Sequence, residues 1–110
     1  MLMTYKRPLD ERERHLSKAQ QYVNAALEIA RGSPDPRDLL NIRVEKGSTI
    51  VRNGELQAKR PNFDPREVAQ LKSDALKELL DVVDEARRLG SQEIEVSDII
   101  RSAESWISRL

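Results

Sequence analysis

Two stretches of the chain repeat apolar residues every three or four positions, the spacing that places side chains on one face of an α-helix. The first covers about residues 9–31 and stops at Gly32. The second covers about residues 65–89, follows Asp64 as a helix cap and stops at Gly90. An Asp before the first turn and a Gly after the last one are typical helix boundaries. We therefore predict two long helices over these ranges.

The segment between the two helices has a different pattern. Apolar and polar side chains tend to alternate over residues 42–59, as they do in a strand with one buried face. Asn53-Gly54 is a strong signal for a two-residue hairpin turn, and Gly47-Ser48 can form a second one. The pattern predicts a short three-stranded β-ribbon at about residues 42–59, preceded by a loop at about residues 32–41.

A last helix is predicted over about residues 98–109. Residues 93–96 alternate like a short strand, and Ser97 is a suitable N-cap for the helix that follows. The expected fold is a single α+β domain of residues 1–110 that is predominantly helical. Its order is a long helix, a short ribbon or hairpin, a second long helix and a short C-terminal helix.

The run from Val83 to Ile99 also resembles a known family. It reads as the end of a long helix, then Gly90, then a short strand over residues 93–96 and the start of another helix. This order is similar to the end of the central helix, the second loop and the start of the last helix in histone-fold proteins. The resemblance implies a long helix crossed by shorter elements, an arrangement that often dimerises.

Composition adds a reason to expect self-association. Charged residues make up 35% of the 110 residues and aromatic residues only 4%, so the core must be built from Leu, Val and Ile. A thin aliphatic core of this kind is common in helical proteins that bury further surface by forming oligomers. The chain has no cysteine, and no run approaches the roughly 18 apolar residues of a membrane span. We expect a cytoplasmic protein with no membrane partner.

Charge is divided unevenly along the chain. Residues 1–63 hold 12 Lys and Arg against 8 Asp and Glu, a net charge of +4, whereas residues 64–110 hold 7 against 11, a net charge of −4. The basic side chains in and just after the predicted ribbon are Arg43, Lys46, Arg52, Lys59 and Arg60. The second long helix carries a row of acidic side chains at spacings of four, three and four: Asp74, Glu78, Asp81 and Glu85.

Catalytic chemistry has no recognisable pattern in this sequence. His15 is the only histidine and lies among charged residues on the first helix, and the four glycines stand alone at predicted turns and helix ends. The acidic row has the spacing of a solvated helix face with ordinary ion pairs, or of a docking surface for a basic partner. We predict no catalytic, cofactor-binding or metal-binding residues, and no enzymatic activity.

The predicted function is a small, non-enzymatic interaction or assembly module. Apolar helix faces would join copies of the chain, while the basic ribbon would dock on an acidic protein surface such as the acidic row of another copy. The alternative is a nucleic-acid-binding protein whose Arg43, Arg52, Lys59 and Arg60 contact phosphates. The basic and acidic residues named above are therefore the candidate partner-binding residues.

Overall fold

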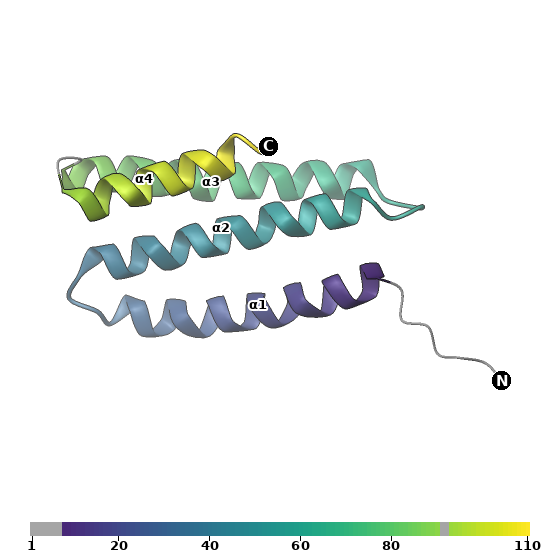
Figure 1. Cartoon of the computed structure of the whole chain (residues 1–110), viewed down its shortest axis with the longest axis horizontal. Coiled ribbons are helices and arrows are strands. Elements are labelled where there is room, and N and C mark those ends of the chain that lie inside the picture. Colours follow the sequence, from purple (N-terminus) through teal and green to yellow (C-terminus); the bar gives the residue numbers. More distant parts are fainter. Residues whose placement is uncertain (1–7, 91–92) are drawn as a thin grey trace.

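In a computed structural model that describes residues 8–90 and 93–110, the protein consists of four helices (Figure 1). They are α1 (Pro8–Arg31), α2 (Pro36–Ala58), α3 (Pro65–Leu89) and α4 (Ile94–Ile107). Helix α2 packs against both α1 and α3, and α4 packs against α2 and α3. Within the described ranges, α1 packs against no helix except α2. No helix of these ranges is long and apolar enough to cross a membrane.

The predicted β-ribbon is wrong, because α2 runs without a break through residues 42–58. No strand occurs within residues 8–90 and 93–110. Gly47 and Gly54, which were expected in two-residue turns, lie inside the helix and are buried. In the part of the chain that the structure describes, Gly90 is the only residue with positive φ. Neither glycine of α2 therefore has the backbone conformation that the predicted turns require.

The helix forms here because its start is capped and its buried face is continuous. Asp35 accepts a hydrogen bond from the backbone N–H of Arg37 at 2.9 Å, and Pro36 occupies the first helical position. Apolar and small residues then recur at steps of three and four: Leu40, Val44, Gly47, Val51 and Gly54. A short ribbon alone would bury too little apolar surface to be stable, whereas the central helix is covered by three neighbours.

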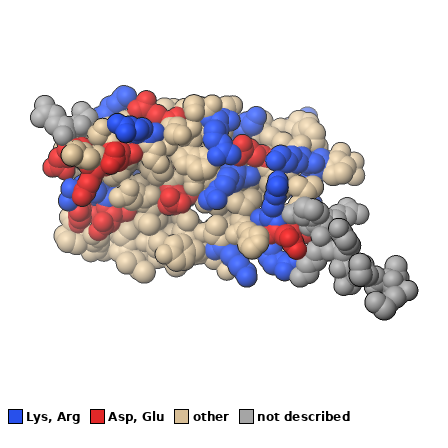
Figure 2. All heavy atoms as spheres, in the orientation of Figure 1, with Lys and Arg blue, Asp and Glu red and all other residues tan. Residues whose placement is uncertain are grey.

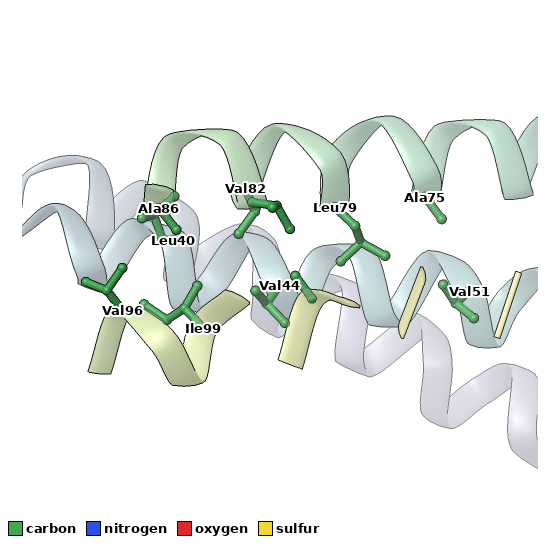
Figure 3. Close-up of a cluster of buried hydrophobic side chains, with 11 residues drawn as sticks. Leu40, Val44, Val51, Ala75, Leu79, Val82, Ala86, Val96 and Ile99 are labelled. Carbon is green, nitrogen blue, oxygen red and sulfur yellow. The ribbon is translucent and has the colours of Figure 1, made fainter. Parts of the chain in front are cut away.

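Gly47 is the point at which α3 packs against the backbone of α2. A Cβ atom at this position would lie 2.5 Å from Cδ2 and 2.7 Å from Cγ of Leu79. Leu79 is fully buried in the core (Figure 3). Glycine costs up to about 1 kcal/mol relative to Ala inside a helix, but here it makes room for the Leu79 side chain. Close packing therefore explains why a glycine occupies position 47 inside a helix, although the same glycine resembles a turn signal in the sequence.

The structure confirms two of the predicted helices and corrects the third. Helices α1 and α3 cover nearly the ranges expected from their apolar spacing. Asp64 caps α3 by accepting a hydrogen bond from the backbone N–H of Arg66 at 2.9 Å, and Gly90 follows its last residue with φ of 105°. Residues 94–96 belong to α4 and not to a strand, because the buried residues Val96 and Ile99 follow helical spacing.

The resemblance to histone-fold proteins does not extend to the architecture. It implied one long helix crossed by shorter elements, but α2 and α3 have 23 and 25 residues and pack along each other. The main core lies where α2, α3 and α4 meet (Figure 3). Its buried members on α3 and α4 include Ala75, Leu79, Val82, Val96 and Ile99. The half-buried side chains of Trp106, Ile107 and Leu110 pack against this cluster and continue it to the chain end.

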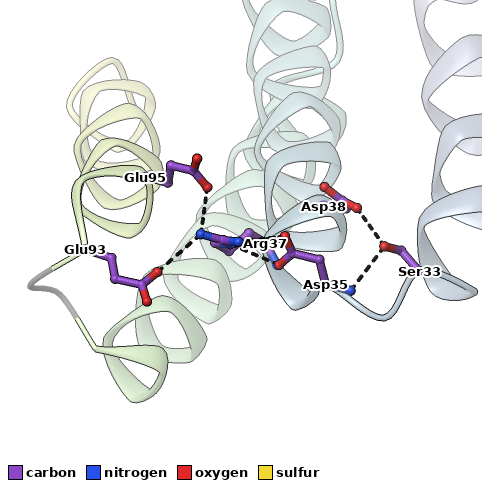
Figure 4. A network of polar contacts seen from close by, with 6 residues as sticks. All are labelled: Ser33, Asp35, Arg37, Asp38, Glu93 and Glu95. Atoms are coloured by element: carbon purple, nitrogen blue, oxygen red, sulfur yellow. Dashed lines mark hydrogen bonds and ion pairs between the residues drawn. The ribbon is translucent and has the colours of Figure 1, made fainter.

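A polar cluster joins the start of α2 to the start of α4 (Figure 4). The Arg37 guanidinium lies 2.9 Å from the Asp35 carboxylate, 2.8 Å from Glu95 and 3.3 Å from Glu93. The pKa of Asp35 is lowered, first because the Arg37 side chain donates hydrogen bonds to its charged form and then because the Arg37 backbone N–H does. The carboxylate state of Asp35 therefore favours the folded structure.

This linkage predicts a pH-dependent contribution of Asp35 to stability. Because the folded pKa lies below the ordinary value of 3.8, the contribution is complete above that value and is lost as pH falls through the folded pKa. We expect the difference in unfolding free energy between wild type and Asp35→Asn to be constant near neutral pH and to shrink below about pH 4. Urea titrations at several pH values measure it. An equal difference at every pH would contradict the linkage, and Arg37→Gln should weaken the pH dependence.

Candidate functional site

A groove of about 340 Å³ lies between the N-terminal half of α1, the C-terminal half of α2 and the end of the chain. We call it the basic groove. Nine residues line it: Arg12, His15, Leu16, Ala19, Arg52, Glu55, Leu56, Lys59 and Arg109. It therefore combines four cationic side chains and one acidic side chain with an apolar part formed by Leu16, Ala19 and Leu56.

Positive charge gathers at this end of the molecule. Figure 2 shows Lys and Arg side chains clustered on the half of the visible face where α2 ends, and Asp and Glu side chains mainly toward the opposite end. Within the basic groove, Arg109 donates a hydrogen bond from Nη2 to Oε1 of Glu55 at 2.6 Å. Among the described residues, Arg12, Arg52 and Lys59 have no ion-pair partner. The arrangement favours a ligand that carries negative charge.

Trp106 holds two of the groove's cations in place. Its ring centre lies 4.5 Å from the Arg109 guanidinium and 5.8 Å from that of Arg52. Both distances are within the range of cation–π attraction, which is about 6 Å. The indole therefore links α2 to the chain end directly beside the basic groove. Because Trp106 is the only tryptophan in the chain, its fluorescence reports on this site.

The helical conformation of α2 brings its part of the basic groove together. Glu55 and Leu56 lie three and four residues after Arg52, and Lys59 lies four and three residues after them, so all four share one side of the helix. The sequence pattern identified Arg52 and Lys59 as candidates, but it missed Arg12, His15 and Arg109. These three join the site only because α1 and the chain end lie beside α2. The sequence shows that Arg12 and His15 share one side of α1, but it does not show that this side lies beside the end of α2.

The other predicted basic residues of α2 meet the acidic row within the same chain. Arg43 donates a hydrogen bond from Nε to Glu78 at 3.0 Å, and its Nη1 lies 2.9 Å from Oε1 of Glu85. The Nζ of Lys46 lies 3.9 Å from Oε2 of Glu78. The side chains of Arg43 and Glu78 are only 16% and 18% exposed. These residues form an ion-pair network between α2 and α3.

Partial burial and two carboxylates act on the Arg43 charge in opposite directions. Loss of solvent opposes the charged form of Arg43, but hydrogen bonds and charge attraction from Glu78 and Glu85 outweigh it and raise the arginine pKa. Arg43 therefore remains charged and engaged with α3. A partner that bound this residue would first have to separate it from two carboxylates, and the mostly buried Glu78 would lose its main cation.

The remaining candidates occupy three different places. Arg60 follows α2 and pairs with Asp10 and Glu13 of α1, so it fastens the two helices at their shared end. Asp74 is exposed and accepts a hydrogen bond from Gln70 on the same helix at 2.8 Å. Asp81 is exposed and has no ion-pair partner among the residues that the structure describes. The predicted acidic row is therefore partly engaged within the chain and partly open to solvent.

Two further observations bear on the chemistry of the site. Within residues 8–90 and 93–110, no cluster of three or more His, Asp or Glu side chains could hold a metal ion. No protein-family model, curated protein or solved structure matches the chain.

Proposed function

We propose that the protein is an interaction module that binds an acidic segment of another protein in the basic groove. The observation that carries this proposal is the combination of three cations without ion-pair partners in the described structure with an apolar surface in one groove. Carboxylates of the bound segment would meet Arg12, Arg52 and Lys59. Apolar side chains of the same segment would cover the exposed parts of Leu16 and Ala19.

The ion pairs between α2 and α3 support the choice of one part of α2 as the docking element. Arg43 and Lys46 already neutralise carboxylates of α3, so a partner gains little from them. Arg52 lies further along α2 and Lys59 directly follows the helix, and both line the basic groove. The docking element is therefore the C-terminal half of a helix, one that presents its cations along a single side.

A protein ligand fits the basic groove better than the phosphates of a nucleic acid. Sites for single-stranded nucleic acid usually add aromatic rings on which bases stack, and Trp106 already has the Arg109 guanidinium over its ring. The groove also exposes part of Leu16 and Ala19, which match the apolar side chains of a peptide that binds as an amphipathic helix. The cations of the groove attract either ligand, but the apolar contacts favour the peptide.

Titration of Trp106 fluorescence with a synthetic peptide tests the proposal. The probe is a Glu-rich and Leu-rich sequence that forms an amphipathic helix. We expect a saturable change in emission that weakens as salt is added, because exposed charges are screened. Arg12→Gln and Lys59→Gln should each raise Kd by roughly fivefold, since one partly exposed ion pair contributes about 1 kcal/mol.

Matched controls separate the groove from general charge. Lys72→Gln and Lys77→Gln remove the same charge from exposed positions on α3 and should leave peptide affinity unchanged. Leu16→Ser should weaken binding of the peptide but not binding of a single-stranded or duplex oligonucleotide. Circular dichroism verifies that the variant is folded. If oligonucleotides bind more tightly than the peptide with a steep salt dependence, the nucleic-acid alternative replaces this proposal. Absence of binding by both probes would refute both.

A further inference from the structure

One side of α1 carries large apolar residues that the described structure leaves uncovered. Tyr22 and Ile29 are 75% and 78% exposed and lie seven positions apart, which is about two helical turns. Ala25 and Ala26 lie between them. Figure 2 shows that the face over the C-terminal half of α1 is largely free of charged side chains. An uncharged helix surface with two projecting apolar side chains is suited to packing against another helix.

A second groove, of about 580 Å³, lies directly beside these residues. It is formed by the C-terminal half of α1 and the N-terminal half of α2, and we call it the apolar groove. Its lining includes Ala26, Ile29, Ala30, Asp38, Asn41 and Ile42. Asp38 accepts a hydrogen bond from the Ser33 hydroxyl at 2.6 Å (Figure 4). The apolar groove thus has an apolar middle and an acidic group at one end.

We infer that two copies of the chain pair through antiparallel α1 helices, each inserting Tyr22 into the apolar groove of the other. A two-fold symmetric interface requires one surface patch to be complementary to itself. With the symmetry axis between positions 25 and 26, Tyr22 of one copy faces Ile29 of the partner subunit. Ala25 and Ala26 then lie at the axis, where their small side chains allow the two helices to approach closely.

Charge complementarity supports a second copy as the occupant. The same axis places Lys18 opposite Ser33 of the partner subunit. Within each chain the Ser33 hydroxyl donates a hydrogen bond to Asp38. Lys18 is exposed and has no ion-pair partner among the described residues. Its ammonium would therefore meet the partner's Asp38 at the end of the apolar groove. The Tyr22 hydroxyl, which needs a hydrogen-bond partner once its ring is covered, would find the amide of the partner's Asn41.

This interface is separate from the basic groove. Tyr22 and Lys18 do not line the basic groove, and Arg12, Arg52 and Lys59 do not line the apolar groove. A dimer would therefore present two basic grooves and could hold two acidic segments at once. Failure of peptide binding would not affect the dimer proposal, and a strictly monomeric protein would not affect peptide binding.

Sedimentation equilibrium of the whole chain across a range of concentrations tests the interface. We expect a reversible monomer–dimer equilibrium with Kd on the order of micromolar, as for interfaces at the small end of the usual range. Tyr22→Ser should shift the equilibrium to monomer. It should leave the thermal unfolding of the monomer unchanged, because the side chain is mostly exposed. A wild-type protein that stays monomeric at about a hundred times this concentration would overturn the inference.

A charge exchange distinguishes this dimer from any other. Lys18→Glu and Asp38→Lys should each weaken dimerisation by roughly tenfold through like-charge repulsion, and the double variant should recover most of the loss. Lys77→Glu, the same change on the exposed surface of α3, is the matched control and should have no effect. Circular dichroism verifies that each variant is folded. If the double variant is as weak as the two single variants combined, Lys18 and the partner's Asp38 do not meet and the proposed pairing is wrong.

Discussion

Replacement of Gly47 by Ala is expected to destabilise the protein by about 1–3 kcal/mol, although Ala is the better helix former. The new Cβ would lie 2.5 Å from Cδ2 and 2.7 Å from Cγ of Leu79. Leu79 has no exposed surface, so it can move only by displacing other core residues or by separating α2 from α3. Urea denaturation followed by circular dichroism measures the loss.

Gly54 provides a matched control in the same helix. A Cβ atom there would meet Cβ of Leu71 at 3.6 Å, an ordinary contact distance. Gly54→Ala should therefore stabilise the protein by up to about 1 kcal/mol, because it removes the entropic cost of glycine in a helix. A Gly47→Ala variant at least as stable as the wild type would show that α3 does not pack against the α2 backbone at this position.

A second variant tests whether Leu79 is the cause. Leu79→Ala alone should cost about 2–5 kcal/mol, because it leaves a cavity in the core. Combined with Gly47→Ala, the total cost should be smaller than the sum, since the added methyl group occupies space that the leucine has vacated. If the losses in unfolding free energy of the two single variants simply add in the double variant, contact with Leu79 is not the reason that Gly47→Ala is destabilising.

The wrong prediction of a β-ribbon over α2 is explained in part by the contact between Gly47 and Leu79. Asn53-Gly54 and Gly47-Ser48 are strong turn signals in isolation, and the alternation around them favours a ribbon. Leu40, Val44, Gly47, Val51 and Gly54 also follow helical spacing, but only if glycines are counted as core positions. For Gly47 that choice depends on Leu79, which lies 32 positions further along the chain. The helices α1 and α3 were predictable because their faces are formed by ordinary apolar side chains.

The candidate site was predictable to a smaller extent than the helices. Arg52 and Lys59 were identified because they belong to a basic segment, whereas Arg12 and Arg109 reach the groove only through the packing of distant segments. The opposite charges of Arg43 and Glu78 were also recognised, but they were expected to meet between copies of the chain. In the structure they lie 3.0 Å apart in one chain. Complementary charge indicates that two segments attract each other, but not whether they belong to the same molecule.

Deletion of residues 106–110 is expected to lower the free energy of unfolding by about 3–5 kcal/mol. It removes three half-buried apolar side chains, those of Trp106, Ile107 and Leu110, which pack against the core. Each would contribute about 1–1.5 kcal/mol, roughly half of the value for complete burial. Thermal and urea unfolding followed by far-ultraviolet circular dichroism measure the change, since the only tryptophan is lost.

The point variant Arg109→Gln separates burial from charge in this deletion. It removes the ion pair with Glu55 and one cation–π contact of Trp106, but it keeps all three apolar side chains. Because exposed ion pairs contribute little, its loss of stability should stay below about 1 kcal/mol. Arg109→Gln should also weaken binding of the acidic peptide, because the basic groove loses one of its cations. Unchanged stability of the deletion would show that the C-terminal residues lie on the core without supporting it.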